Sequence, residues 1–358
     1  MNGIDLFNNA IKNKLINNVA FLKGRMGYMP GFTGIAGNLK RQEKVRTEIL
    51  KSRDITVPPI LIISVTRECN LACKGCYDCA LDREDNNELT VEDIDRIVGE
   101  GVESGVGLIF FAGGEPLLKK GLLDIPEKYS KTLFVLFTNG LLIDDALMNR
   151  LGEIKNIVPA LSLEGNEEST DVRRGPGVFN AIHKVMKNMD KRHLLFGASI
   201  TLTRNNYREV MNTAFLQGIE SSGCRTLFLI EYVPCDGDPE LCLTEEQKRD
   251  LILQMERLPQ EYSMLPVALP GDEEKFGGCL AAGRGFLHIS STGDVEACPF
   301  APFSDVNLKN LSFLEALESR LLGKIRENHH LLEEAEGGCT LFENQTWVES
   351  LMAKQDVS

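Results

Sequence analysis

Three cysteines at short spacings are the part of this sequence most able to do chemistry. Cys69, Cys73 and Cys76 lie within the segment CNLACKGCY. Three thiolates can ligate three irons of a four-iron cluster, whose usual complement is four cysteines. The fourth iron then keeps an open position for an external ligand, which distinguishes a catalytic metal centre from a closed structural one. The spacing alone also allows a zinc site with Cys79 as its fourth ligand, because CxxC pairs suit zinc too.

A second group of cysteines lies near the C-terminus. Cys279 and Cys298 flank a predicted hairpin over residues 285–298, whose turn contains Gly293, and Cys339 follows in the sequence EGGC. A turn glycine that brings distant cysteines together is typical of a metal site built on a hairpin. The alternative is that these cysteines are small buried apolar residues, as free cysteines often are.

The elements that position the first cysteine group form a regular alternation of strands and helices. Strands are expected at residues 58–66, 107–112, 132–138, 157–163, 194–203 and 226–233. Helices are expected between them, near residues 90–104, 117–129, 144–154, 177–190 and 206–221, with a capping box at Thr90 and an N-cap at Asp144. Continuous apolar strands that alternate with helices predict a parallel sheet covered on both faces. Six such units predict an α/β fold with a partial, open (β/α)6 TIM-like barrel.

This architecture places the first cysteine group at the mouth of the barrel. The segment CNLACKGCY follows directly on the first predicted strand, and loops after strands lie on the C-terminal face, where the active sites of such barrels are found. Beyond the sixth strand, residues 236–275 are acidic and are expected to form loops and helices, before the hairpin and a helical tail. We therefore divide the chain into a leader at 1–56, a barrel domain at 57–235 and a small C-terminal α+β domain at 236–358.

The leader is basic and carries one apolar helical face. Residues 1–53 contain ten Lys or Arg and three Asp or Glu, a net charge of +7, whereas the whole chain has a net charge of −13. Apolar residues recur every three or four positions, at Ile4, Phe7, Ile11, Leu15, Val19 and Leu22. Such a face predicts an amphipathic helix that packs on the protein core. The alternatives are a lid over the active site, or a peripheral membrane contact on anionic lipid.

The overall composition narrows the class of protein. A net charge of −13 argues against nucleic acid as the main partner. The sequence has no apolar run long enough to cross a bilayer and no signal-peptide pattern, so a cytoplasmic location is expected. Ten cysteines in such a chain favour metal ligation or redox chemistry over a disulfide framework.

The first cysteine group resembles the cluster motif of the radical S-adenosylmethionine (SAM) superfamily, which is CxxxCxxC with an adjacent aromatic residue, here Tyr77. Further segments resemble SAM-binding motifs of the same superfamily, and their order places them on one rim of the barrel. They are GGEP (Gly113, Gly114, Glu115, Pro116), TNG (Thr138, Asn139), SLEG (Ser162, Glu164), DVRRG (Arg174) and, on the fifth strand, Ser199. The resemblance implies a [4Fe–4S] cluster on Cys69, Cys73 and Cys76, with SAM bound at the remaining iron.

The resemblance also implies how SAM is held. Glu115 would accept a hydrogen bond from the SAM amino group, and the neighbouring glycines allow close backbone approach. Arg174 can pair bidentately with the SAM carboxylate. The TNG and SLEG segments lie near the ribose and methionine moieties in the superfamily, and Glu164 stands where aspartate is commoner. No residue of the sequence is assigned as a catalytic acid or base.

The second cysteine group resembles the auxiliary-cluster domains of the superfamily, called SPASM when they hold two clusters and twitch when they hold one. The Cys–Gly–Cys spacing matches the start of the SPASM pattern, whereas its later dense CxxC run is absent. The resemblance therefore implies one auxiliary cluster, expected to be [4Fe–4S], on Cys279, Cys298 and Cys339. Cys235 or Cys242 would supply a fourth ligand, or an open iron would bind the substrate. Cys79 and Cys224 are interpreted as structural.

The implied activity is the reductive cleavage of SAM. An external donor of flavodoxin or ferredoxin type would supply one electron, and a 5′-deoxyadenosyl radical would abstract a hydrogen from the substrate. An auxiliary cluster favours a net oxidation, so the expected enzyme is an oxidoreductase or maturase that modifies a peptide or a small metabolite. The alternative is an iron–sulfur electron-transfer or metal-sensing protein without radical chemistry.

Overall fold

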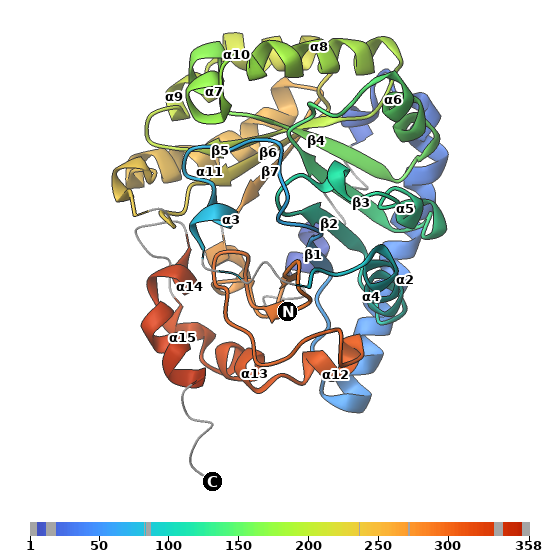
Figure 1. Ribbon diagram of the computed structural model, residues 1–358, viewed down its shortest axis with the longest axis vertical. Helices are drawn as coiled ribbons and strands as arrows, with labels where there is room; N and C mark the ends of the chain where they lie inside the picture. Colours follow the sequence, from blue (N-terminus) through green and yellow to red (C-terminus); the bar gives the residue numbers. More distant parts are fainter. Residues whose placement is uncertain are drawn as a thin grey trace.

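Within the part of the chain that the structure describes, nine strands form one curved sheet (Figure 1). The computed structural model describes residues 6–11, 19–81, 83, 87–235, 237–270, 273–332 and 339–352. Six strands correspond to those expected from the sequence: β1 Ile60–Ser64, β2 Leu108–Ala112, β3 Leu133–Thr138, β4 Ile157–Leu163, β5 Gly197–Leu202 and β6 Thr226–Glu231. They pair in chain order and all in parallel, which confirms the predicted α/β partial barrel.

Two further parallel strands extend the sheet at its edges. β7 (Leu265–Leu269) pairs with β6, and β8 (Phe286–Ile289) pairs with β1. The sequence analysis missed β7, because this short segment contains Pro266 and follows an acidic helix; a proline is tolerated here since β7 lies at the sheet edge. The predicted hairpin is present, with β9 (Val295–Glu296) antiparallel to β8. Because β8 pairs with β1, the hairpin continues the barrel sheet.

Helices cover the outer face of the sheet, and most begin where capping residues indicate. They are α4 Val91–Glu103, α5 Asp124–Lys128, α6 Asp145–Glu153, α7 Glu167–Arg174, α8 Val178–Lys191, α9 Tyr207–Val210, α10 Thr213–Ser221 and α11 Glu245–Glu261. The capping box between Thr90 and Asp93 forms as predicted, and the Asp144 side chain accepts from the backbone of Leu147. The helix expected at 206–221 is divided, because Asn212 caps the start of α10.

Side chains of alternating orientation along each strand build two apolar layers. Leu61, Ile63 and Phe111 pack between the sheet and the helices, whereas Phe110 and Phe228 point into the barrel. Both layers are almost completely excluded from water. Because neighbouring positions of a strand face opposite sides, the continuous apolar runs seen in the sequence are what a sheet buried on both faces requires.

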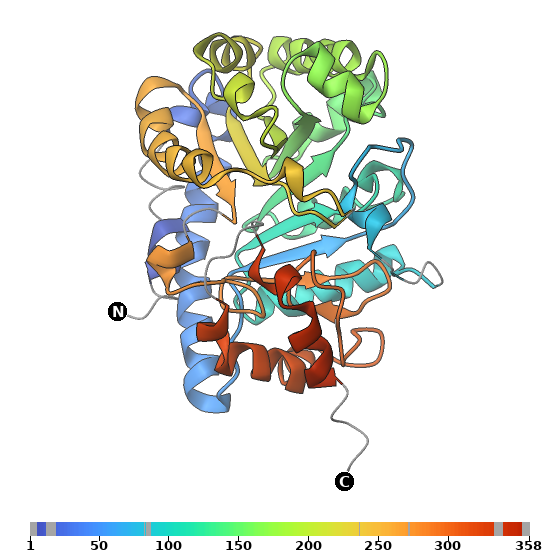
Figure 2. The same cartoon turned by 90° about the vertical axis from the view of Figure 1, so that its left-hand side faces the viewer.

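The amino ends of the strands are covered by a long helix that the sequence analysis did not place. This helix is α2 (Met29–Arg53), which follows two short 3-10 turns, η1 (Val19–Leu22) and η2 (Met26–Tyr28). Leu39 of α2 lies against Gly107, just before β2, and the same side of the helix contributes Phe32 and Ile35 to the barrel interior. Figure 2 shows α2 crossing the barrel on the side away from the strand tips.

The described residues of the leader's apolar face pack on the protein core, which supports the first interpretation of that segment. Leu22 is buried in the barrel interior with Phe21, and the Phe7 ring packs edge-on against Phe276. Ile4 and Leu15 lie outside the described residues. No helix in the described part of the chain is both long and apolar enough to cross a membrane.

The C-terminal segments lie beside β8, β9 and α4 (Figure 1). Their helices are α12 Phe313–Leu317, α13 Arg320–Glu327, α14 Thr340–Glu343 and α15 Gln345–Met352. A hydrogen bond from the Phe313 backbone to the Glu100 carboxylate (2.7 Å) and one from Arg96 to the Leu308 carbonyl join this part to α4. The described residues of 273–332 and 339–352 are thus built against one side of the barrel.

Candidate functional site

The first cysteine group lies in the loop that leaves the carboxyl end of β1. Cys69 is exposed, whereas Cys73 and Cys76 are half-buried; the short helix α3 (Tyr77–Ala80) begins immediately after them. Burial raises the pKa of Cys69 and of Cys73, and the nearness of each thiol to the others of the group raises it further. The structure therefore brings the three thiols together at the mouth of the barrel, as their spacing predicts.

The GGEP segment after β2 is pressed against the cysteine loop. The backbone N–H of Gly114 donates to the Thr66 carbonyl, and that of Glu115 donates to the Glu68 carbonyl, both at 2.7 Å. A Cβ on Gly113 would lie 2.3 Å from the Thr66 oxygen, and one on Gly114 would lie 2.2 Å from the Glu68 oxygen. Gly113 also has a φ of +118°. Glycine is required at both positions, since no other residue allows so close an approach.

Glu115 holds the neighbouring loop in place. Its carboxylate is fully buried, and it accepts hydrogen bonds from the Thr138 hydroxyl (2.7 Å), the Asn139 N–H (2.8 Å) and the Leu117 N–H (3.0 Å). The Asn139 amide in turn donates to the Asn70 side chain at 2.7 Å, within the cysteine loop. Burial raises the pKa of Glu115. The sequence analysis missed this positioning role, and the predicted contact of Glu115 with SAM stays a prediction.

Glu164 anchors two arginines beside the cysteines. Its carboxylate is 2 % exposed, and Oε1 accepts from Arg173 Nη1 (2.7 Å) and from Arg174 Nε (2.8 Å). Arg173 also donates to the Lys74 and Gly75 carbonyls in the cysteine loop. Glu164 Oε2 is buried without a hydrogen-bond partner. Sequence reasoning did not single out Arg173, although the paired arginines at the end of α7 were a visible signal.

Arg174 lies beside the thiols. Its Nη1 lies 4.0 Å from Cys73 Sγ, and its positive charge acts to lower the pKa of Cys73 against the dominant effect of burial. An arginine held by Glu164 at this point has its remaining N–H groups available at the mouth of the barrel. That position suits recognition of an anionic ligand bound next to the cysteines.

The remaining predicted SAM-site residues fall into two places. Ser162 and Ser199 are paired on the adjacent strands β4 and β5, near the Glu164 end of the sheet. The Tyr77 side chain is half-buried instead, with its ring packed edge-on against Phe300 at a centroid distance of 5.2 Å. Burial raises the pKa of the Tyr77 phenol. Tyr77, the aromatic residue next to Cys76, therefore contacts the turn that follows Cys298.

The second cysteine group is assembled from three segments that are distant in sequence. Cys298 follows β9, Cys279 precedes β8, and Cys339 precedes α14. The Cys298 and Cys339 thiols hydrogen-bond to each other, and Cys279 lies near enough to interact electrostatically with both. Burial raises the pKa of Cys279 well above its ordinary value. The structure thus brings together the three residues that the hairpin pattern predicts.

The other cysteines occupy different surroundings. Cys224 is fully buried, with its thiol 3.1 Å from the Thr226 carbonyl, as expected of a structural residue. Cys242 is also buried; burial raises its pKa, and the positive charges of Lys248 and Arg204 act to lower it. Cys79 is exposed, and its thiol contacts that of Cys76.

Both cysteine groups suit a polynuclear cluster in their donor atoms. Among the described residues, no three His, Cys, Asp or Glu side chains are arranged to hold a single metal ion. A four-iron cluster distributes its ligands over several irons, so its thiolates need not converge on one point. The buried free oxygen of Glu164, the Arg174 guanidinium and the glycine-lined approach at Gly113 are features that a polar, charged ligand such as SAM fits.

Comparison with known proteins identifies the domain that contains the first cysteine group. Residues 63–216 match the family model described as the Radical SAM superfamily. This part of the chain is therefore a radical SAM domain, and such a domain implies a [4Fe–4S] cluster and SAM.

Two curated relatives come from Methanosarcina barkeri. Fe-coproporphyrin III synthase is 32% identical over 157 residues, which are 42% of this chain and 39% of that protein. AdoMet-dependent heme synthase is 25% identical over 315 residues, which are 80% of this chain and 88% of that protein. The first alignment thus spans well under half of the relative, and the second spans most of it.

A solved structure confirms the fold. Streptococcus suis SuiB bound to S-adenosylmethionine superposes with a TM-score of 0.65 at 19% identity, covering 81% of this chain and 72% of SuiB. At this identity the likeness shows a shared architecture: a curled, partly closed sheet of radical SAM type.

Proposed function

We propose that this protein is a radical SAM enzyme that binds a [4Fe–4S] cluster through Cys69, Cys73 and Cys76 and cleaves SAM reductively. The observation that carries the proposal is the gathering of these thiols at the barrel mouth, next to the Arg174 guanidinium and the glycine-lined GGEP segment. When bound, the cluster and SAM supply a one-electron cleavage that gives methionine and a 5′-deoxyadenosyl radical for hydrogen abstraction.

The protein residues would orient SAM at the open iron. Arg174, fixed by Glu164, would pair with the SAM carboxylate, and the partner-free Glu164 Oε2 would accept a hydrogen bond from a ribose hydroxyl. The SAM ammonium would lie at the GGEP segment, and Asn139, fixed by Glu115, would face the same ligand. Preorganised contacts of this kind hold the reacting atoms in position without further ordering at the moment of reaction.

We further propose one auxiliary [4Fe–4S] cluster on Cys279, Cys298 and Cys339. Cys279 and Cys298 are buried and Cys339 is half-buried, which would shield such a centre from water, and an auxiliary centre can accept an electron from a substrate radical. The overall reaction would then be a net oxidation of the substrate. Cys235 and Cys242 both stay candidate fourth ligands.

The substrate is proposed to be a small metabolite or a peptide. One relative that aligns over most of the chain is named a heme synthase, which supports a tetrapyrrole-like metabolite as one candidate. SuiB, which shares the fold, has also been solved bound to its precursor peptide SuiA, so a peptide substrate is the second candidate. An external flavodoxin or ferredoxin is the proposed electron donor.

Anaerobic reconstitution with iron and sulfide tests these proposals. Two four-iron clusters would bring the iron content to about eight per chain. Dithionite and SAM should then yield 5′-deoxyadenosine, which chromatography detects. An electron-transfer or metal-sensing protein would take up iron but release no 5′-deoxyadenosine, and that outcome would refute the radical SAM activity.

A further inference from the structure

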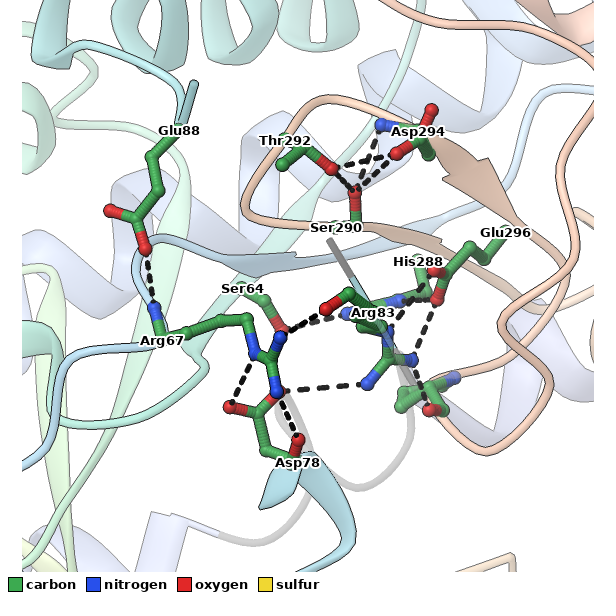
Figure 3. A network of polar contacts seen from close by, with 11 residues as sticks. Ser64, Arg67, Asp78, Arg83, Glu88, His288, Ser290, Thr292, Asp294 and Glu296 are labelled. Atoms are coloured by element: carbon green, nitrogen blue, oxygen red, sulfur yellow. Dashed lines mark hydrogen bonds and ion pairs between the residues drawn. The ribbon is translucent and has the colours of Figure 1, made fainter. Parts of the chain in front are cut away.

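A buried network of polar side chains connects the loop of the first cysteine group with the hairpin of the second (Figure 3). We call it the Arg83 network; its members are Ser64, Arg67, Asp78, Arg83, His288 and Glu296. Asp78, His288 and Glu296 are at most 3% exposed. None of these residues has a part in the cluster-binding or SAM-binding arrangement described above.

Arg83 binds residues that lie just before and just after Cys298 in the sequence. Its guanidinium forms a two-pronged ion pair with Glu296, from Nε to Oε1 at 3.2 Å and from Nη2 to Oε2 at 2.8 Å. The same Nη2 donates to the Pro299 carbonyl at 2.5 Å. Glu296 lies two residues before Cys298, and Pro299 follows it directly. A forked guanidinium in this geometry fixes the orientation of its partner as well as its distance.

Arg83 also contacts the base of the first cysteine loop. Its Nη1 lies 3.5 Å from the Asp78 carboxylate, and Asp78 lies two residues after Cys76. Arg67, two residues before Cys69, donates to the backbone carbonyls of Arg83 and Asp78. The two ends of the cysteine loop are therefore joined to each other and, through one side chain, to the hairpin.

His288 completes the connection through the sheet. Its Nδ1 lies 2.7 Å from Glu296 Oε2, and its Nε2 lies 2.9 Å from the Ser64 hydroxyl at the end of β1. Burial lowers the pKa of His288, so the neutral ring donates to Glu296 and accepts from Ser64. Arg67 and Arg83 then neutralise the carboxylates of Asp78 and Glu296. Such pairing is needed because a buried charge without a partner is strongly destabilising.

We propose that Arg83 is a positioning residue that holds the first cysteine loop and the Cys298 turn at a fixed separation. The two cysteine groups belong to loops that are distant in sequence, and apolar packing alone leaves small shifts between loops inexpensive. Electron exchange between two centres depends steeply on their separation, so a charged, forked contact on both loops would hold that separation constant. This inference rests on the proposed auxiliary cluster for its functional meaning, whereas the contacts themselves do not depend on it.

The test compares anaerobically reconstituted wild type with Arg83→Met, Arg83→Lys and Arg25→Met. Arg25 is the matched control, because its side chain is 3% exposed against 6% for Arg83, pairs with a carboxylate (Asp190, 2.6 Å) and donates to a carbonyl, but lies near the amino ends of the strands. Two measurements are made on each protein. Pulsed electron paramagnetic resonance reports the magnetic interaction between the two reduced clusters, and hydrogen exchange reports the opening of residues 69–81 and 295–301.

The proposal predicts one defined magnetic interaction in wild type and in Arg25→Met, and a broadened one in Arg83→Met with the iron content unchanged. Hydrogen exchange in both segments should be about tenfold faster or more in Arg83→Met, since one partner of a buried ion pair is lost. Arg83→Lys should give a spectrum and exchange rates between those of wild type and Arg83→Met, because an ammonium can bond to one acceptor but cannot form the two-pronged contact. Equal spectra and exchange in Arg83→Met and Arg25→Met would overturn the proposal.

Two outcomes separate this inference from the proposed function. A wild-type protein with about four irons per chain would refute the auxiliary cluster, and the exchange measurement alone would then decide whether Arg83 joins the two segments. If Arg83→Met does not fold, Glu296→Gln replaces it. That variant keeps the volume and removes the charge, so it should loosen the same two segments, and unchanged exchange there would overturn the proposal.

Discussion

The two cysteine groups differ in how the chain assembles them. Cys69, Cys73 and Cys76 come from one loop, and Cys69 is exposed at the barrel mouth. Cys279, Cys298 and Cys339 come from three separate segments, and the first two are buried. A site that exchanges ligands with solvent needs an open side, whereas a site that only passes electrons is better protected when it is closed. The difference in exposure thus matches the difference in proposed roles.

The surroundings of the two groups differ in the same way. The first is framed by polar, hydrogen-bonded loops in which Glu115 and Glu164 hold the residues that would face SAM. The second lies deeper, with Cys279 and Cys298 packed among residues of the hydrophobic core and the Arg83 network beside Cys298. Polar framing at the first group fixes side chains for recognition of a charged ligand, and burial of the second lowers the local dielectric around an electron carrier.

Replacing Cys73 with alanine is expected to have the largest effect of any single change. The variant should release no detectable 5′-deoxyadenosine, since the site would lose one of its three thiolate ligands. It should keep about four irons per chain, because the second group is untouched. Chromatography of the reaction products and an iron assay check both parts. Cys224→Ala is the control, as that thiol is buried elsewhere and bonds only to the backbone in the contacts described.

Replacing Cys298 with alanine should have the opposite result: the second group should lose its cluster, and the first should keep its cluster and its activity. We expect iron to fall to about four per chain while SAM cleavage continues, because the first group is intact. Turnover of the true substrate should stop, since the electron from the substrate radical would have no acceptor. A variant that keeps the iron content and spectrum of the wild type would contradict the assignment of Cys298 as a ligand.

Changing Glu164 to glutamine tests the polar framing of the first group alone. The change leaves Arg173 and Arg174 without a charged partner in a mostly buried setting, which costs on the order of 3 kcal/mol of stability when a buried pair is broken. We expect the KM for SAM to rise about tenfold, because Arg174 is no longer held in position. Thermal unfolding and SAM titration measure the two effects. Glu168→Gln, an exposed residue of the same helix, should change neither.

Much of the barrel and of the first group is predictable from the sequence because the signals are local. Each buried strand is a short apolar run, and the capping box at Thr90 is contained in four residues. The edge strand β7 was missed because Pro266 and its acidic neighbours hide a strand that pairs on one side only. The glycine-rich first half of α2 has low helix propensity, and burial of residues such as Phe32 and Ile35 stabilises it instead.

The features that escaped prediction depend on partners far apart in the chain. Nothing near Arg83 in sequence indicates that it meets Glu296, 213 residues away. The hydrogen bonds from Thr138 and Asn139 to Glu115 likewise form only when β2 and β3 are adjacent in the folded sheet. The second cysteine group was predictable in outline because Cys279 and Cys298 lie on either side of one hairpin, which is a local signal.

The smallest expected effect concerns Cys79, which lies beside the first group without being one of its proposed ligands. Its thiol contacts Cys76, so a single metal ion bound there could use it as a fourth ligand. A three-thiolate cluster does not need Cys79. The Cys79→Ala variant should therefore keep the iron content of the wild type and release 5′-deoxyadenosine at a rate within about twofold of it, because substitutions of exposed residues usually have small effects. Loss of all metal at this group in Cys79→Ala would show that four thiolates close the site. The open iron on which SAM cleavage depends would then not exist.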